Sequence, residues 1–226
     1  MTAPRSYAKE RFSMSKLSKI LETSIVKTLR FNLHYFGWGG VRLPVLVARN
    51  YALTELRGKV SIADPRPGCV RLGYSSVGIF DARYDRGLWQ NSGEVAFDGD
   101  AVFAQGSKIS VGANGHLSVG DGFRNMAKGE FVCHERMRLG AGSLVSWDTL
   151  FMDTDFHQLD GKPASAPVTL GDNVWVGCGC TVLKGASVPD GSVLAAGATV
   201  TKALAPERSL FGGVNKLLRV GIEWNE

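Results

Sequence analysis

A six-residue period governs the second half of the chain. From Val168 onward the sequence divides into six hexads: VTLGDN, VWVGCG, CTVLKG, ASVPDG, SVLAAG and ATVTKA. The third position of every hexad is Leu or Val, the first is small or β-branched, and Gly closes four of the six. Helices and strands alone do not repeat every six residues. A very short strand followed by a sharp corner does, with the aliphatic and small residues inside and Gly or Asn in the corner.

The same period recurs upstream in a rougher form. It places seven residues six apart in two runs: Phe97, Phe103 and Ile109, then Cys133, Leu139, Val145 and Phe151. The pattern blurs across 113–125 and breaks across 158–167 (QLDGKPASAP), after which the register is shifted by one. Three units close one triangular coil of roughly 18 residues, and stacked coils pair their strands in parallel around a continuous core.

Three stretches carry a resemblance to a known family: MDTDFH (152–157), PVTLGDNVWVG (167–177) and AAGATVTKA (195–203). With the hexads, they resemble the left-handed β-helix, hexapeptide-repeat acyltransferases, and among these the sugar or polysaccharide O-acetyltransferases of the galactoside and maltose type. The resemblance is strong across 95–219 and looser across 45–94. It implies an all-β, left-handed parallel β-helix with an N-terminal helical extension.

The expected domain organisation follows from the extent of the repeat. Residues 1–40 form a basic helical extension, residues 41–205 form the β-helix acyltransferase domain, and residues 206–226 form a C-terminal tail that closes the coenzyme site. The extension shows helical spacing at Leu17, Ile20, Leu21, Ile25, Thr28 and Leu29, with Ser15 as a possible cap, and is broken at Phe36–Gly40. Two interpretations stay open for this helix: packing on the main domain or a neighbouring subunit, or lying on the inner face of a membrane.

Charge and composition exclude several classes of protein. Hydrophobic residues make up 44% of the chain and charged residues 21%, which argues against wholesale disorder. Residues 1–60 carry 11 Lys and Arg against 3 Asp and Glu. No helix-turn-helix, RNP or zinc-finger pattern accompanies this basic segment, so nucleic acid is not an expected partner. The sequence shows no secretory signal and no apolar run that spans a membrane, and the four Cys are expected to be reduced thiols in the cytoplasm.

His157 is the candidate catalytic base. It falls where the inward series of Leu139, Val145 and Phe151 would continue, just as a polar loop leaves the coil. An imidazole can accept a proton near neutral pH, and an acceptor hydroxyl is a poor nucleophile until a base takes its proton. The resemblance implies this role for His157. Nearby residues could assist: Asp153 or Asp155 could orient the ring or serve only as turn residues, and His134 could contact the sugar.

The resemblance also implies acetyl-CoA as the acyl donor, used in direct transfer without an acyl-enzyme. Trp175 would line the pantetheine arm or the acceptor pocket, and Cys178 and Ala196 would contact pantetheine. The nucleotide end would lie near Thr201, Lys202 and Arg219, although the segment GGVNKLLR (212–219), which ends with Arg219, lacks the usual Pro. No metal is expected, because the Cys178–Cys180 pair has no partner pair at a zinc spacing.

The expected acceptor is a hydroxyl of a sugar or polysaccharide precursor. The resemblance also implies a homotrimer with each active site between two subunits. Three alternatives stay open: an N-acetyltransferase acting on an amino sugar or its nucleotide-linked form, a non-catalytic β-helix scaffold, and a zinc enzyme like the γ-class carbonic anhydrases. The last needs His residues on adjacent coils, and the spacing of His134 and His157 does not match one coil.

Overall fold

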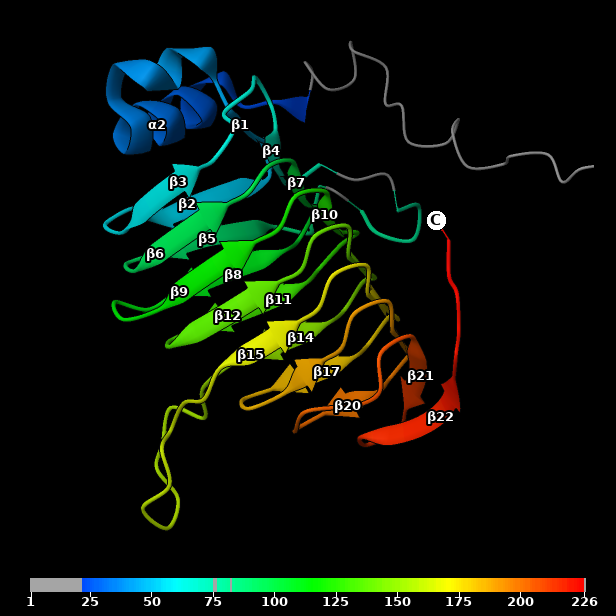
Figure 1. Cartoon of the computed structure of the whole chain (residues 1–226). Helices are drawn as coiled ribbons and strands as arrows, with labels where there is room; N and C mark the ends of the chain where they lie inside the picture. Colours follow the sequence, from blue (N-terminus) through cyan, green and yellow to red (C-terminus); the bar gives the residue numbers. More distant parts are fainter. Residues whose placement is uncertain (1–21, 75–76, 82, 226) are drawn as a thin grey trace, which may run out of the picture.

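The computed structural model describes residues 22–74, 77–81 and 83–225, and these form a three-sided parallel β-helix (Figure 1). Until the last two strands, successive strands go to successive sides, so every third strand pairs in the same sheet. The predicted fold is confirmed: each turn of chain contributes one short strand to each of three parallel sheets, and the side chains of all three meet in a common core.

We name the three sides sheets I, II and III. Sheet I contains β1 (Val45–Val47), β4 (Val70–Leu72), β7 (Ala101–Phe103), β10 (Phe123–Asn125), β13 (Leu144–Val145), β16 (Trp175–Val176), β19 (Val193–Leu194), β21 (Ser209–Gly212) and β22 (Lys216–Val220). Sheet II contains β2 (Tyr51–Glu55), β5 (Gly87–Asn91), β8 (Lys108–Val111), β11 (Glu130–Cys133), β14 (Leu150–Met152), β17 (Thr181–Leu183) and β20 (Thr199–Val200). Sheet III contains β3 (Lys59–Ile62), β6 (Glu94–Phe97), β9 (His116–Val119), β12 (Arg136–Leu139), β15 (Val168–Leu170) and β18 (Ser187–Val188).

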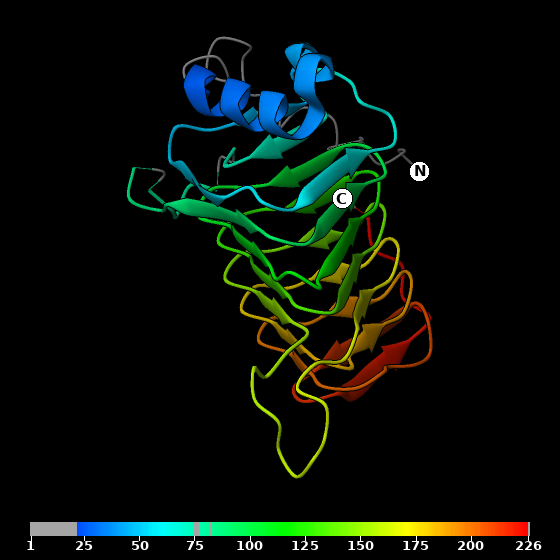
Figure 2. The ribbon, with the colours of Figure 1, turned by 90° about the vertical axis from the view of Figure 1, so that its left-hand side faces the viewer.

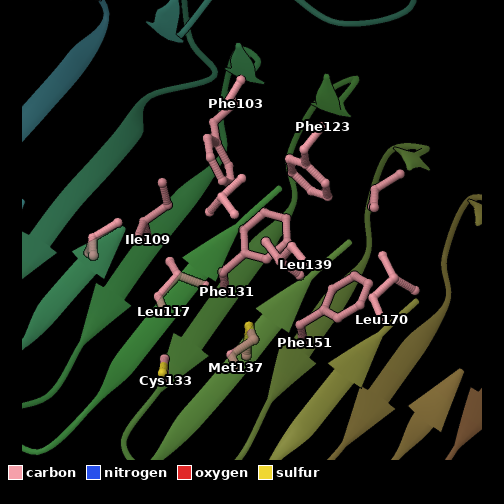
Figure 3. Close-up of a cluster of buried hydrophobic side chains, with 14 of the residues drawn as sticks. Phe103, Ile109, Leu117, Phe123, Phe131, Cys133, Met137, Leu139, Phe151 and Leu170 are labelled. Carbon is pink, nitrogen blue, oxygen red and sulfur yellow. The ribbon is translucent and has the colours of Figure 1, made fainter. Parts of the chain in front are cut away.

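The core is a set of side-chain columns that run along the solenoid. In sheet II the paired inward residues are Trp89, Ile109, Phe131, Phe151, Val182 and Val200, all buried. Figure 3 shows how the rings of the middle coils fill the interior, with the Phe131 and Phe151 rings stacked 5.3 Å apart. Bulky rings therefore occupy the early and middle coils, whereas Val occupies the same column in the late coils.

The early coils are longer than the 18 residues expected from the hexads. Ile109 pairs with Phe131 and Phe131 with Phe151, whereas late pairs such as Val182 and Val200 show the 18-residue spacing. A polar residue also takes an inward place: Asn125 is fully buried and its amide is bonded to Ser107 Oγ and to carbonyls of the next corner. Wider coils and an internal amide explain why the period blurs across 113–125.

A helix closes the N-terminal end of the solenoid (Figures 1 and 2). It is α2 (Ile25–Phe36), capped by Ser24 and followed by the 3-10 helix η1 (Gly37–Arg42). The Asn32 amide donates to Val45 O at 2.6 Å and accepts from Val45 N at 3.1 Å, so it satisfies the open edge of β1. Of the two roles expected for this helix, the structure shows packing on the main domain. The predicted cap Ser15 lies outside the described residues.

The C-terminal end is closed by a hairpin. Strand β21 pairs in parallel with β19, and β22 turns back antiparallel to β21. The chain then returns along sheet I, where Trp224 Nε1 donates to Asn173 O at 2.7 Å. Among the described helices, none is long and apolar enough to cross a membrane.

Candidate active site

A long loop leaves the solenoid where the hexads break, between β14 and β15. Its two arms pair at the root: Asp155 N donates to Ala164 O at 2.8 Å, and Ala166 N donates to Asp153 O at 2.9 Å. Beyond these contacts the loop projects past the C-terminal end of the stack in both views (Figures 1 and 2). The loop lies at the corner between sheets II and III.

Asp153 anchors the root of this loop from inside the protein. Its carboxylate is fully buried and accepts the backbone N–H groups of His134 and Glu135 at 2.7 and 2.8 Å. Such charge-assisted hydrogen bonds offset the cost of removing the carboxylate from water. Burial, and next to it the charge of Asp153, raises the pKa of the adjacent Cys133 thiol, which therefore stays protonated.

Lys184 ties the two arms together from the next coil. Its Nζ lies 2.6 Å from Asp155 Oδ2 and donates to Pro163 O at 2.9 Å. The side chain is 27% exposed, and it comes from the corner between β17 and β18. The loop arms are thus fixed by one buried carboxylate and one bridging ammonium group.

The imidazole of His157 is exposed on the outer part of the loop. Neither Asp153 nor Asp155 bonds to it, and His157 has no hydrogen-bond or ion-pair partner among the residues that the structure describes. Both carboxylates hold the loop root instead of the ring. The His134 ring lies at the same root, with its centroid 4.8 Å from that of Phe156.

The predicted donor residues meet in a pocket at another corner, between sheets I and II. Trp175, Cys178 and Ala196 all line this cavity of about 310 Å³, beside Ser146 and Trp147. The Trp175 indole donates from Nε1 to Ser146 Oγ at 3.3 Å, which fixes one wall. Three residues that the resemblance assigned to the donor, from two separate motifs, thus line one cavity.

Glycine and free amides shape the pocket floor. A Cβ at Gly177 would lie 2.6 Å from Ala196 N, so the two coils approach closely only because Gly stands there. In the described part of the chain, the backbone N–H groups of Cys178 and Ala196 have no hydrogen-bond acceptor, whereas Gly177 N donates to Leu194 O. The pocket, which is mainly apolar, therefore offers two free backbone N–H groups as hydrogen-bond donors.

The remaining predicted residues lie near the C-terminal tail. The Thr201 hydroxyl accepts from Asn215 Nδ2 at 2.7 Å, and Thr201 N donates to Asn215 Oδ1 at 2.8 Å. Lys202 is exposed after β20, and Arg219 is exposed on β22. Asn215 stands in the segment that lacks the family Pro, and it ties the tail to the last coil by side-chain hydrogen bonds.

Sequence reasoning missed four residues of this region: Ser146, Trp147, Lys184 and Trp224. The first two had a usable signal, because Val145 pairs with Val176 and the next two residues therefore lie beside Gly177 and Cys178. Trp224 places its ring 6.2 Å from that of Trp175, but no repeat marks the tail. Lys184 occupies an ordinary corner position in CTVLKG, so its partners in the loop were not visible.

The loop and the pocket lie at different corners of one chain. Sheet II separates them, and its strand β14 has 3 residues, which span about 10 Å. In the described ranges, no group of three or more His, Cys, Asp or Glu is placed to hold a metal ion.

The comparisons with known proteins point to acetyltransferases over part of the chain. A protein of Schizosaccharomyces pombe provisionally named an acetyltransferase is 39% identical over 72 residues, 29% of this chain and 35% of the relative. One of Staphylococcus aureus, named in the same way, is 34% identical over 64 residues, 28% of this chain and 32% of the relative. An uncharacterized protein in the cps region of Klebsiella pneumoniae is 27% identical over 86 residues, 37% of this chain and 38% of the relative. The chain therefore spans about a third of the length of these relatives.

Two solved structures are also similar. The polySia-specific acetyltransferase NeuO has a TM-score of 0.48 and 21% identity, covering 80% of this chain and 79% of that chain. A maltose O-acetyltransferase from Clostridium difficile has a TM-score of 0.37 and 16% identity, covering 93% and 90%. No protein-family model matches the chain. The resemblance to hexapeptide-repeat acetyltransferases is confirmed by the sequence relatives over the stretch that they cover.

Proposed function

We propose that the protein is an acetyltransferase that moves an acetyl group from acetyl-CoA to a hydroxyl of a sugar or polysaccharide precursor. The observation that carries this proposal is the meeting of Trp175, Cys178 and Ala196 in one pocket. The resemblance assigns these residues to the donor. The register of the coils makes Cys178 and Ala196 neighbours, because Val176 pairs with Leu194, and all three side chains face the cavity instead of the core.

The pocket suits the pantetheine arm of the donor. Its lining is mainly apolar, and the free N–H groups of Cys178 and Ala196 can donate to the amide carbonyls of the arm or to the thioester oxygen. At the nucleotide end, Lys202 and Arg219 supply positive charge for phosphate groups, while Asn215 holds Thr201 against the tail.

The chemistry is direct transfer with His157 as general base. The imidazole accepts the proton of the acceptor hydroxyl while that oxygen attacks the thioester carbonyl carbon. The C–S bond then breaks, and the imidazolium gives its proton to the sulfur of CoA, which leaves as a thiol. Burial raises the pKa of Cys133 and raises that of Cys180 to about 11, so neither thiol is suited to form an acyl-enzyme.

The site is completed between copies of the chain. Within one chain, sheet II lies between the His157 loop and the pocket, so a loop from one subunit must reach the pocket of another. A cyclic homotrimer of triangular solenoids meets this requirement. The donor places the proposed activity in the cytoplasm.

The test is thiol release from acetyl-CoA with a panel of hydroxyl and amino sugars. We expect His157→Ala to lower turnover by about 10²–10⁴-fold, the usual size of a general-base contribution. His116→Ala is the matched control, because His116 is an exposed imidazole paired with Glu94 outside the site. Near-normal turnover of the His157 variant would show that His157 is not the general base. Acetylation of amino groups alone would show that the enzyme is an N-acetyltransferase.

A further inference from the structure

Helix α2 carries apolar side chains on two opposite faces. One face packs on the first coil, where Phe31 is fully buried. The opposite face is open to solvent: Val26 is 76% exposed and Ile25 is 72% exposed, and Leu29 and Leu33 continue the same stripe. A surface helix of a soluble protein ordinarily turns polar residues outward, so this second apolar face requires an explanation.

The 3-10 helix η1, which follows α2 directly, also exposes apolar side chains. The Trp38 side chain is 88% exposed, and Val41 beside it is also exposed. Next to Trp38 lies a hollow of about 710 Å³ whose walls include Pro44, Ile62 and Pro65. An indole at the rim of an apolar surface is typical of groups that insert at the boundary between lipid and water.

Positive charge accompanies the apolar face. Arg30 and Arg42 are exposed on the same two elements. In the sequence, residues 1–21 carry 5 Lys and Arg against 1 Glu. A second copy stacked end to end would bring two basic ends together, whereas an anionic lipid surface has the opposite charge.

We infer that the end-cap face, formed by Ile25, Val26, Leu29, Leu33, Trp38 and Val41, docks on an anionic lipid surface. The apolar side chains enter the region between headgroups and acyl chains, and the flanking basic residues contact the headgroups. The binding is peripheral, and it is independent of the proposed function.

The geometry separates this face from the proposed transfer site. The end-cap face and the projecting loop lie at opposite ends of the solenoid (Figures 1 and 2). Between β2 and β14 there are four strand spacings, or about 19 Å. Changes to the face therefore leave transfer to a water-soluble acceptor unaltered.

The experiment is co-sedimentation of the full-length protein with vesicles. Binding is measured on phosphatidylcholine alone and on phosphatidylcholine mixed with phosphatidylserine, for the wild type and for the double variant Val26→Ser/Trp38→Ala. The matched control is Ile79→Ser/Tyr84→Ala, which changes two exposed apolar residues between β4 and β5. Thermal unfolding of each variant verifies that the fold is retained.

We expect the wild type and the control to bind the anionic vesicles and the face variant to bind about tenfold more weakly or less. Added salt should weaken the wild-type binding. Equal binding by the face variant contradicts the inference. A wild type that stays in solution with the vesicles also contradicts the inference. The face would then be covered either by residues 1–21 or by a second copy of the chain. A second copy would be shown by an association that depends on protein concentration and that Trp38→Ala abolishes.

Discussion

The two corners that carry the candidate site are built by different means. The pocket corner lies inside the regular coils, where each strand is paired in register and each neighbouring turn repeats the last. The loop corner lies where the repeat is interrupted, and Asp153 and Lys184 hold it through a few polar contacts. The pocket is therefore sensitive to side-chain size, and the loop is sensitive to the loss of single charged groups.

The largest expected effect on stability is at the loop root. Asp153→Ala leaves the buried N–H groups of His134 and Glu135 without an acceptor, which should lower the free energy of unfolding by about 3 kcal/mol. Urea denaturation measures this change. Asp155→Ala is the matched control in the same loop, because its carboxylate is 48% exposed, and it should cost under about 1 kcal/mol. Similar losses in both variants would show that burial does not distinguish the two carboxylates.

At the pocket corner, size should matter instead of charge. Ala196→Phe fills the cavity with an outward side chain, so we expect the KM for acetyl-CoA to rise about tenfold or more, with little change in unfolding. Ala113→Phe places the same ring at an exposed corner away from the pocket and serves as the control. Unchanged KM in the first variant, measured by steady-state thiol release, would mean that the arm lies elsewhere.

A smaller effect is expected when only the clamp on the loop is removed. Lys184→Met loses the contacts to Asp155 and Pro163, so the loop becomes less ordered and kcat should fall about tenfold. The free energy of unfolding should change by less than about 1 kcal/mol, because the pair is partly exposed. Limited proteolysis should cut the loop faster in this variant, and Lys184→Arg should restore resistance. If kcat falls while loop cleavage stays slow, Lys184 acts in some other way.

The same contrast explains what the sequence could predict. From Val168 onward the hexads placed Val182 and Leu194 correctly in the core, because a strict period leaves one inward register. They did not predict Asn125 as an inward residue, because its amide is satisfied only by groups from other coils. The early coils are also longer than the hexads predict, because residues added at their corners follow no fixed period.

The candidate site divides in the same way. Trp175 and Cys178 were identified because they belong to a repeat whose neighbours are known from spacing alone. The expected contact between His157 and an Asp is not made within the chain, because the path of a long polar loop depends on residues such as Lys184 that are remote in sequence. The outward apolar face of α2 was likewise invisible until the buried face was known.

The central claim is that the pocket at Trp175 and Cys178 holds the donor, and thiol alkylation tests it most directly. Cys69, Cys133 and Cys180 are buried, and only Cys178 is partly exposed. Near neutral pH a small alkylating reagent should therefore label Cys178 alone, since burial also keeps the pKa of Cys180 at about 11. Addition of acetyl-CoA, whose thioester leaves no free thiol to consume the reagent, should slow the labelling of Cys178 at least tenfold, as located by peptide mass spectrometry. A labelling rate that saturating acetyl-CoA leaves unchanged would contradict the assignment of this pocket.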